Sequence, residues 1–246
     1  MSRRLKRRKI TGFDEGYLDK VLSVEPSNLV GCWLQNEPSG GVSYDSSGNS
    51  HHGAYTGVTL GQPGVPGMDM TSPFFDGAGD FNNIYSAELG AAYNQAELSI
   101  LTWFRTVNAG IWTDGATRKL FRFFVDANNT LKAERGAANN VIDIKVEHAT
   151  TNEFLLWTTV GAPTTWQCLM VTISQANDRV FVYGNGVEED AAVGLGVWAG
   201  PLSATDTLIG SINTGGGSHN WHGWIGPTAV WGTELSSGEA AYLSTT

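Results

Sequence analysis

The chain has 246 residues and a net charge of −9, with 31 glycines and an aromatic content of 11%. This length is typical of a single all-β sandwich, and the composition suits many short strands joined by tight turns. No apolar run approaches the about 18 residues that a transmembrane helix needs, which argues against an integral membrane protein.

The charge is distributed very unevenly along the chain. Residues 11–246 contain nine basic and twenty-four acidic residues, a net charge of −15. Residues 1–10 (MSRRLKRRKI), which we call the basic arm, contain no acidic residue and six basic ones, namely Arg3, Arg4, Lys6, Arg7, Arg8 and Lys9. A secretory signal would need an apolar segment after these cations, and the following residues are polar. We therefore expect this protein to reach its place of work without such a signal.

The basic arm has three interpretations. It can be a docking peptide for the acidic surface of a neighbouring protein chain, a solvated tail without a specific role, or an arm that binds nucleic acid. The acidic remainder of the chain would repel a polyanion, and no aromatic residue lies between the arginines as a stacking platform requires. We expect docking to other subunits of an assembly, including further copies of this chain, rather than binding to nucleic acid.

The first predicted element is a short amphipathic helix over residues 14–24, which ends before Pro26. Its apolar residues recur at helical spacing, so the helix should lie against the rest of the protein or against a partner. These apolar residues are Tyr17, Leu18, Val21 and Leu22. The pattern divides the chain into residues 1–28, the basic arm with its helix, and residues 29–246, one sandwich domain.

From Leu29 onward, strand-like segments alternate with turns rich in Gly, Asn and Asp, as in an antiparallel sandwich. Residues 61–67 (GQPGVPG) contain too much Pro and Gly for a regular element, and residues 106–118 are expected to form a long loop.

Two local motifs predict specific structures near the C-terminus. The strand-like residues 179–183 precede Asn185-Gly186, a pair that tolerates the positive φ angles of a type I′ hairpin turn. Ser236 and Glu239 have the spacing of a capping box, which predicts a short helix after Ser236.

Seven segments, in order along the chain, resemble one known architecture. They are Leu29–Trp33 (LVGCW), Asp45–Gly53 (DSSGNSHHG), Phe75–Phe81 (FDGAGDF), Leu98–Arg105 (LSILTWFR), Thr165–Ser174 (TWQCLMVTIS), Val180–Gly186 (VFVYGNG) and His222–Leu243 (HGWIGPTAVWGTELSSGEAAYL). Together they resemble the laminin-G-like branch of the concanavalin A-like lectin/glucanase superfamily. The resemblance implies a two-sheet antiparallel jelly-roll sandwich. It leaves the function open, because this fold serves sugar binding, protein binding, hydrolysis and structural display.

The hydrolases of this superfamily use acidic residues that alternate along one strand, as in E-x-D-x-E, so that the carboxylates share one face. The sequence has no such motif. Asp143 and Glu147 lie four residues apart, but Lys145 stands between them on the same face, which favours an exposed, charge-balanced strand. Residues 188–190 (EED) follow the Asn-Gly turn and are expected in a solvated hairpin arm. We therefore expect no enzymatic activity and no catalytic residue.

Asp45 and Asn49 are the candidate ligands for a structural calcium ion, the only cofactor that the sequence suggests. They flank a glycine in a turn, and their side-chain oxygens are the type that Ca²⁺ prefers. Some members of the superfamily hold a calcium ion, and these positions would inherit it. The alternative is an Asx turn, in which both side chains bond the backbone. Relatives often have an acidic pair where this chain has Gly226-Pro227, which removes carboxylates.

The nine tryptophans are the candidates for sugar stacking, because the apolar face of a sugar ring packs on an aromatic ring. Five lie in strand patterns and are expected in the core: Trp33, Trp103, Trp166, Trp224 and Trp231. Trp112, Trp198 and Trp221 lie in loop-like contexts. The candidate contacts for a glycan or a partner are Trp112 with Asp114, and Trp221 with Asn220. The alternative is that each loop tryptophan covers an edge of the sandwich.

Cys32 and Cys168 both lie in apolar, strand-like segments. We expect two buried free thiols, because free cysteine is among the most buried residue types, with a disulfide between them as the alternative.

Three functional hypotheses remain. The first is a non-enzymatic structural, accessory or decoration protein of a virus particle, such as a tailed phage, with a lectin-like sandwich that is docked by the basic arm and also able to bind host glycans. The second is a carbohydrate-binding or adhesion module at a cell surface. The third and most remote is a glycoside hydrolase. The first hypothesis places the protein on the virion surface or tail, and the second places it outside the cell.

Overall fold

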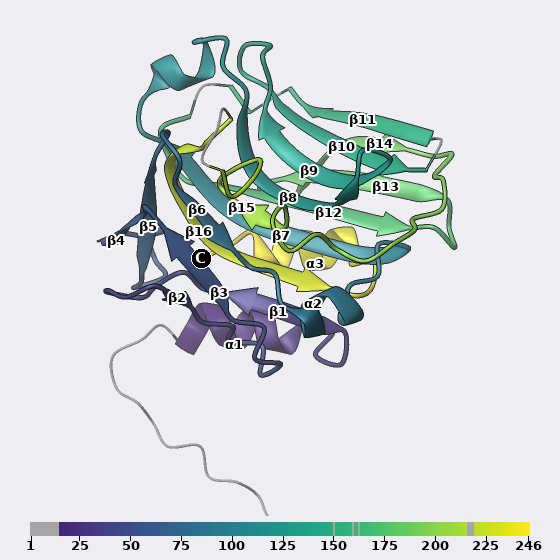
Figure 1. Ribbon diagram of the computed structural model, residues 1–246, viewed down its shortest axis with the longest axis horizontal. Helices are drawn as coiled ribbons and strands as arrows, with labels where there is room; N and C mark the ends of the chain where they lie inside the picture. The colour runs from purple at the N-terminus through teal and green to yellow at the C-terminus, as the bar shows by residue number, and fades with distance from the viewer. Residues whose placement is uncertain (1–14, 150, 159, 162, 216–218) are drawn as a thin grey trace, which may run out of the picture.

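A computed structural model describes residues 15–149, 151–158, 160–161, 163–215 and 219–246. Two antiparallel sheets pack face to face in the described residues, with short helices at the periphery (Figure 1). The basic arm lies outside the described residues.

Sheet A has the strand order β14-β13-β12-β7-β16-β5-β4, and β1 also pairs with β16. Its strands are β1 (Leu29–Trp33), β4 (Thr59–Pro63), β5 (Thr71–Asp76), β7 (Glu97–Thr106), β12 (Gln167–Ser174), β13 (Arg179–Gly184), β14 (Val187–Ala192) and β16 (His222–Trp231).

Sheet B has the order β11-β10-β9-β8-β15-β6-β3-β2. Its strands are β2 (Val42–Ser43), β3 (Gly53–Thr56), β6 (Phe81–Asn83), β8 (Arg118–Asp126), β9 (Asn129–Arg135), β10 (Ile142–His148), β11 (Thr151–Trp157) and β15 (Leu208–Ile209). The helices are α1 (Glu15–Ser23), α2 (Ala87–Ala92), the 3-10 turn η1 (Ala109–Trp112) and α3 (Ser237–Leu243). The architecture is the two-sheet antiparallel jelly-roll sandwich that the sequence predicted, with its short N-terminal helix.

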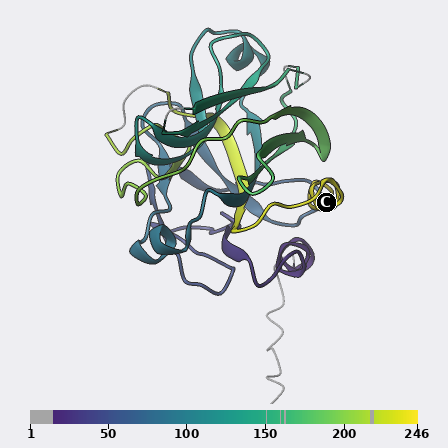
Figure 2. The same cartoon turned by 90° about the vertical axis from the view of Figure 1, so that its right-hand side faces the viewer.

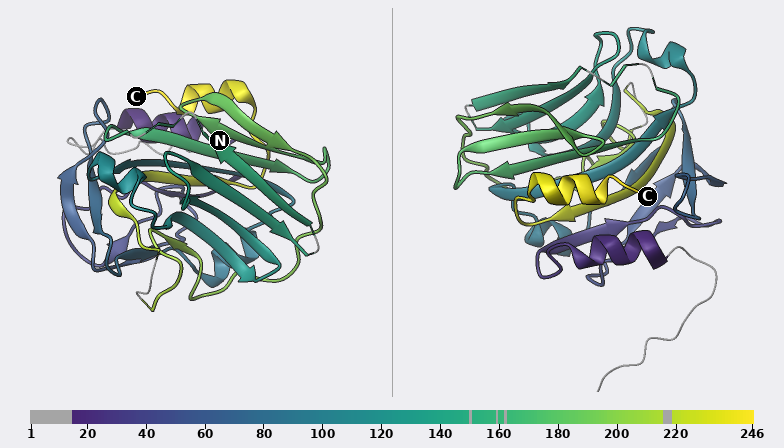
Figure 3. Two further views of the ribbon diagram at one scale, coloured as in Figure 1. Left: turned by 90° about the horizontal axis from the view of Figure 1, so that it is seen from above. Right: turned by 180° about the vertical axis from the view of Figure 1, so that it is seen from behind.

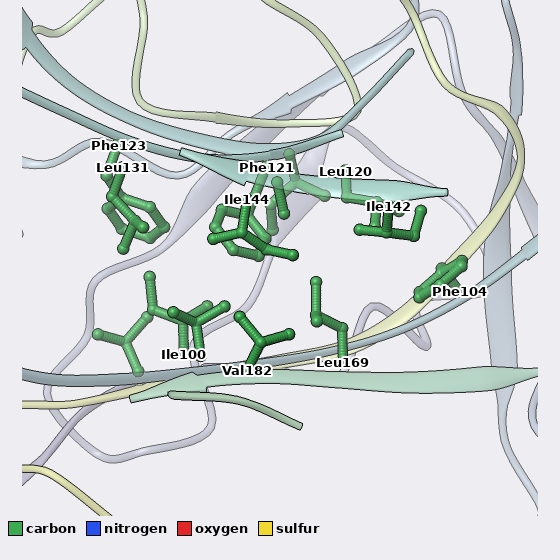
Figure 4. Close-up of a cluster of buried hydrophobic side chains, with 14 of the residues drawn as sticks. Ile100, Phe104, Leu120, Phe121, Phe123, Leu131, Ile142, Ile144, Leu169 and Val182 are labelled. Atoms are coloured by element: carbon green, nitrogen blue, oxygen red, sulfur yellow. The ribbon is translucent and has the colours of Figure 1, made fainter. Parts of the chain in front are cut away.

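The main core lies between the two sheets. In Figure 4, side chains from β8, β9 and β10 point toward side chains from β7, β12 and β13 across the sandwich. The labelled residues are Ile100, Phe104, Leu169 and Val182 from sheet A, and Leu120, Phe121, Phe123, Leu131, Ile142 and Ile144 from sheet B. All ten side chains are fully buried. Burial of apolar area on this scale is the main favourable contribution to folding.

A second core lies on the outer face of sheet A, beneath α1 and α3. Figure 2 shows both helices nearly end on, and Figure 3 shows them from behind, lying along the strands. The Tyr17 hydroxyl of α1 donates a hydrogen bond of 3.0 Å to the backbone oxygen of Leu243 in α3. Cys32 and Cys168 belong to this core as free thiols, which confirms the expected state and excludes the disulfide alternative. Burial raises the pKa of the Cys168 thiol to about 12.

The two sheets differ in their burial patterns because α1 and α3 cover the outer face of sheet A only. In β12, every residue after Gln167 is buried, because the main core covers one face and the helices cover the other. In β10, buried and partly exposed residues alternate strictly, because no described helix covers the outer face of sheet B. Strand alternation therefore presents one row of polar side chains to solvent there.

The two local motifs are confirmed. The Asn185-Gly186 turn between β13 and β14 has φ angles of 52° and 81°, in the positive region that a type I′ turn needs. The Ser236 side chain accepts a hydrogen bond from the Glu239 backbone, and the Glu239 carboxylate accepts one from the Ser236 backbone. α1 corresponds to the helix predicted over residues 14–24.

Candidate functional site

The structure buries the two loop tryptophans that the sequence offered as candidate contacts for a glycan or a partner. Trp112 is fully buried, and its Nε1 donates hydrogen bonds to Thr106 Oγ1 at 3.0 Å and to Pro163 O at 2.9 Å. Trp221 is also fully buried and packs edge-on against Phe104, with ring centroids 5.5 Å apart. Both rings lie in the main core, which agrees with the alternative that each loop tryptophan covers part of the sandwich, and neither presents a face on which a sugar could stack.

The polar neighbours of these tryptophans are also engaged within the protein. Asp114 forms ion pairs with Arg118 at 2.6 Å and with Arg135 at 3.4 Å. Burial by itself would raise the pKa of Asp114, but the hydrogen bonds from Arg118 and from the Ala116 backbone lower it below its usual value. Asn220 is buried, and its Oδ1 accepts a hydrogen bond of 2.8 Å from Ser211.

Arg118 also donates to the backbone oxygen of Asn220, so the structure brings the two predicted loops together. This contact holds the two loops to each other, and it uses the polar groups that a ligand would otherwise contact.

The geometry of Asp45 and Asn49 matches the Asx-turn alternative. Asp45 Oδ1 accepts from the backbone nitrogens of Cys32 and Ser47, each at 2.9 Å, and Oδ2 accepts from His51 N at 2.9 Å. The Asn49 amide donates to two carbonyls of β1. Both carboxylate oxygens are therefore already bonded, and no group of three metal-binding acidic, His or Cys residues occurs among the described residues. The side chains do not fit a calcium ion.

Two tryptophans expected in the core lie instead at the surface of sheet A. Trp33, Trp103 and Trp231 are buried as predicted. Trp166 and Trp224, however, are only partly buried. Trp166 lies just before β12 and packs against the second core, while Trp224 lies in β16 and packs against Phe74 and Arg105. Both rings are on the outer face of sheet A.

The outer face of sheet B gathers charged side chains from three neighbouring strands. We call this set the charged face, and it consists of Lys119, Arg122, Lys132, Glu134, Asp143, Lys145 and Glu147. Strand register places Arg122 opposite Lys132, and Lys132 opposite Lys145. In the adjacent row, Lys119 lies opposite Glu134, and Glu134 lies opposite Asp143.

The charged face is internally paired. Lys119 contacts Glu134, whose other oxygen lies 3.4 Å from Lys132 Nζ. Lys145 Nζ lies 2.5 Å from Glu147 Oε1. Arg122 pairs with Asp206, just before β15, at 3.6 Å. The row of Arg122, Lys132 and Lys145 is therefore cationic, and ion pairs link it to the carboxylates beside it.

The charged face is recessed rather than fully solvated. The Glu134 and Glu147 side chains are each only 12% exposed, and Lys145 is 22% exposed. Burial lowers the pKa of Lys132. Burial also raises the pKa of Asp143, and nearby cations offset part of that rise. Ion pairs that are partly shielded from water in this way are held more rigidly than surface pairs, and they are less screened by salt.

Aromatic rings adjoin the charges. The Arg122 guanidinium lies 3.7 Å from the centre of the Phe124 ring, and Lys145 Nζ lies 4.9 Å from that of Phe154. Phe154, on the edge strand β11, is 66% exposed. The face thus combines an exposed apolar ring with fixed donors and acceptors.

Sequence patterns signalled only part of this face. The alternation of Asp143, Lys145 and Glu147 indicated an exposed strand, but it was interpreted as charge balance alone. Lys132 and Glu134 show the same alternation in β9. Only the pairing of β8 through β11 shows that these side chains share one surface.

The carboxylates of the charged face are poorly arranged for glycoside hydrolysis. Glu147 is held by Lys145, and Glu134 is held by two lysines. Hydrolysis requires one protonated and one ionised carboxyl group on either side of the scissile bond. Asp143 alone has the raised pKa of a general acid here, and no unpaired carboxylate of the charged face stands opposite it.

No protein-family model matches the chain, and the comparison with curated proteins gives no significant match. Solved structures do match. The botulinum neurotoxin serotype D binding domain has a TM-score of 0.64 at 14% identity, covering 89% of this chain and 52% of that chain. The binding domain of Paraclostridial Mosquitocidal Protein 1 has a TM-score of 0.64 at 16% identity, with coverage of 89% and 52%. This chain therefore spans about half the length of these toxin binding domains.

Domain 4 of a GH43 extracellular arabinanase from Geobacillus stearothermophilus, solved in complex with arabinotriose, has a TM-score of 0.63 at 17% identity. The match covers 89% of this chain and 98% of that domain. At these identities the likenesses establish a shared β-sandwich fold. In addition, no helix among the described residues is both long and apolar enough to cross a bilayer.

Proposed function

We propose that this protein is a non-catalytic, lectin-like binding module that holds a glycan on the charged face of sheet B. The observation that supports this most directly is the recessed array of paired charges on the sheet face that no described helix covers. A sugar hydroxyl both donates and accepts hydrogen bonds, so it can bridge a lysine and a carboxylate that are already held side by side. Lys132 and Glu134 offer such a pair.

The exposed ring of Phe154 supports the same proposal. It lies at the edge of the charged face beside Lys145, where the apolar face of a sugar can pack on it while the hydroxyls reach the charges. The charged face has four cations, and Asp206 brings its acids to four, so its formal charge is balanced. We therefore propose a neutral glycan as its ligand. The arabinanase domain that shares the fold was solved with a neutral oligosaccharide, which is consistent with this use of the sandwich.

The basic arm favours a more specific setting, in which the module is displayed on a larger particle. Six cations in ten residues cannot bury enough apolar area to fold alone, so an acidic surface of another chain is their natural partner. We propose an accessory or structural protein of a virus particle, such as a phage, docked by the basic arm with the charged face turned outward. A carbohydrate-binding or adhesion module at a cell surface is the alternative.

A screen of neutral oligosaccharides against the full chain tests the glycan proposal. We expect binding that weakens at least about tenfold in Phe154→Ala and in Lys145→Ala, because stacking and a charged hydrogen bond are each lost. Tyr242→Ala and Lys20→Ala are matched controls. Tyr242 is an exposed ring on α3, and Lys20 on α1 lies 5.0 Å from it, over the outer face of sheet A. Both variants should leave binding unchanged.

Two results would contradict the proposal. One is that no neutral glycan binds the full chain, or that the control variants weaken binding as much as the charged-face variants do. The other is hydrolysis of a bound glycan that disappears in Asp143→Asn or Glu147→Gln, which would make the protein a glycoside hydrolase.

A further inference from the structure

Four side chains form a row across the outer face of sheet A, beside the second core, against which the first of them packs. They are Trp166, Arg105, Trp224 and Phe74. Trp224 in β16 is paired in register with Arg105 in β7 on one side and with Phe74 in β5 on the other. The Arg105 guanidinium lies 3.8 Å from the centre of the Trp224 ring and 5.4 Å from that of Trp166.

Arg105 differs from every other described arginine in its partners. Arg118, Arg122, Arg135 and Arg179 each form an ion pair with a carboxylate. Arg105 forms neither an ion pair nor a hydrogen bond with a described residue, and its Nε is shielded from solvent without a partner. Its contacts are the two indole rings.

This arrangement leaves a cation partly desolvated and without a counter-charge from any residue that the structure describes. Burial lowers the pKa of Arg105, and no nearby carboxylate offsets that effect. A partly buried charge without a partner is costly, and an anion that docks against it recovers part of that cost. The guanidinium is planar and is held between two rings, so its free N–H groups are already oriented for a two-oxygen acceptor such as a carboxylate.

The neighbouring ring of Trp166 favours a sugar as the carrier of that carboxylate. The Trp166 ring occupies the space that a side chain at position 226 would need. A Cβ added to Gly226 would lie only 3.2 Å from Cζ3 of Trp166. The ring therefore reaches over β16 beside Arg105, and it is only partly buried. A sugar ring can stack there while its carboxylate meets the guanidinium.

We propose that Arg105, with Trp166 and Trp224, forms a second binding site, which takes the carboxylate-bearing residue of an acidic glycan. This site lies on the sheet opposite the charged face, and it does not depend on the function proposed above.

The test is titration of the full chain with methyl β-D-glucuronide and with methyl β-D-glucoside, followed through the indole N–H signals in NMR spectra. We expect the glucuronide to shift the Trp166 and Trp224 signals and to bind at least about tenfold more tightly than the glucoside, which lacks the carboxylate. Arg105→Gln should abolish this preference. Arg105→Lys should keep only part of it, because an ammonium cannot form the two-pronged contact.

Two further variants separate binding from folding. Gly226→Ala crowds Trp166 without touching the arginine, and it should weaken glucuronide binding while the chain remains folded. Arg179→Gln removes another arginine on the outer face of sheet A, one that is already paired with Glu234, and it should change nothing.

Three outcomes would overturn the proposal. Sodium acetate could shift the same signals with equal affinity, which would show a simple anion effect. A short oligoglutamate peptide could bind while the glucuronide does not, which would indicate an acidic protein partner. Finally, folded Arg105→Gln could bind the glucuronide as tightly as the unaltered chain. Failure of the neutral-glycan screen would leave this result unaffected, because the two sites lie on different sheets.

Discussion

The indole nitrogen of Trp103 donates a hydrogen bond of 2.7 Å to the hydroxyl of Tyr17, and this contact ties α1 to sheet A. The same hydroxyl donates to the backbone of Leu243 and so joins α3 to the pair. Both rings are nearly fully buried, and burial raises the pKa of Tyr17 well above its usual value. One hydroxyl group thus connects both terminal helices with the sandwich.

Tyr17→Phe should lower the free energy of unfolding by about 1–3 kcal/mol, because it leaves the Trp103 N–H and the Leu243 carbonyl unpaired in a dry environment. Urea denaturation followed by tryptophan fluorescence measures this. Tyr242→Phe on the same face is the control, since Tyr242 is 48% exposed and its loss of a hydroxyl should have little effect. Equal stability of Tyr17→Phe and the unaltered chain would mean that α1 is not held by this bond.

Trp112→Ala should destabilise the protein by about 3–5 kcal/mol, as expected for a large aromatic residue removed from a core. Trp33→Ala and Trp103→Ala should cost a similar amount. Trp166→Ala should cost clearly less because Trp166 is only partly buried. If Trp112→Ala retains full stability, the ring is not in the core, and the original interpretation of an exposed contact residue regains support.

The stability of the protein should depend on His148 below neutral pH. His148 is 1% exposed, its Nε2 lies 2.9 Å from Gln95 Nε2, and burial lowers its pKa below the usual 6.5. The unfolded chain therefore binds this proton more readily than the folded protein does. The free energy of unfolding should fall as pH decreases through 6.5 toward the lowered value, by at most about 1.4 kcal/mol per pH unit.

Comparison of the unaltered chain with His148→Gln isolates this contribution from those of the carboxyl groups. The slope of stability against pH between 7 and 5 should be smaller in the variant. If both proteins show the same slope, His148 is not responsible.

Deletion of residues 1–11 should leave the melting temperature nearly unchanged and abolish incorporation into the parent assembly. Raising the salt concentration should weaken docking of the full chain, because exposed charges are screened beyond about 8 Å at physiological ionic strength. Sedimentation of the assembly with each form of the protein measures both effects. Normal incorporation of the truncated chain would reject docking by the basic arm and favour a free adhesion module.

The parts of the structure that follow from local patterns were predictable. The α3 cap depends on two residues in one turn, and the hairpin after β13 depends on the φ angles that Asn and Gly tolerate. The outward direction of Lys145 follows from alternation alone.

The surface positions were harder to predict because they depend on non-local packing. The short motif around Trp112 does not reveal that its ring can reach Pro163 and the core. Trp224 lies in a strand pattern, yet it is only partly buried, because it is on the outer face of sheet A with Arg105 and Phe74 as its ring neighbours. The charged face exists only because β8 and β10 both pair with β9, which brings side chains from three strands onto one surface.

A glycan bound to the charged face should change the surroundings of the residues on the outer face of sheet B. The most direct measurement is the map of backbone amide shifts in NMR spectra of the full chain as the best oligosaccharide from the screen is added. We expect the largest shifts in β8 through β11, around Arg122, Lys132, Lys145 and Phe154. Shifts that concentrate elsewhere, with these four residues unaffected at saturating ligand, would contradict the glycan proposal.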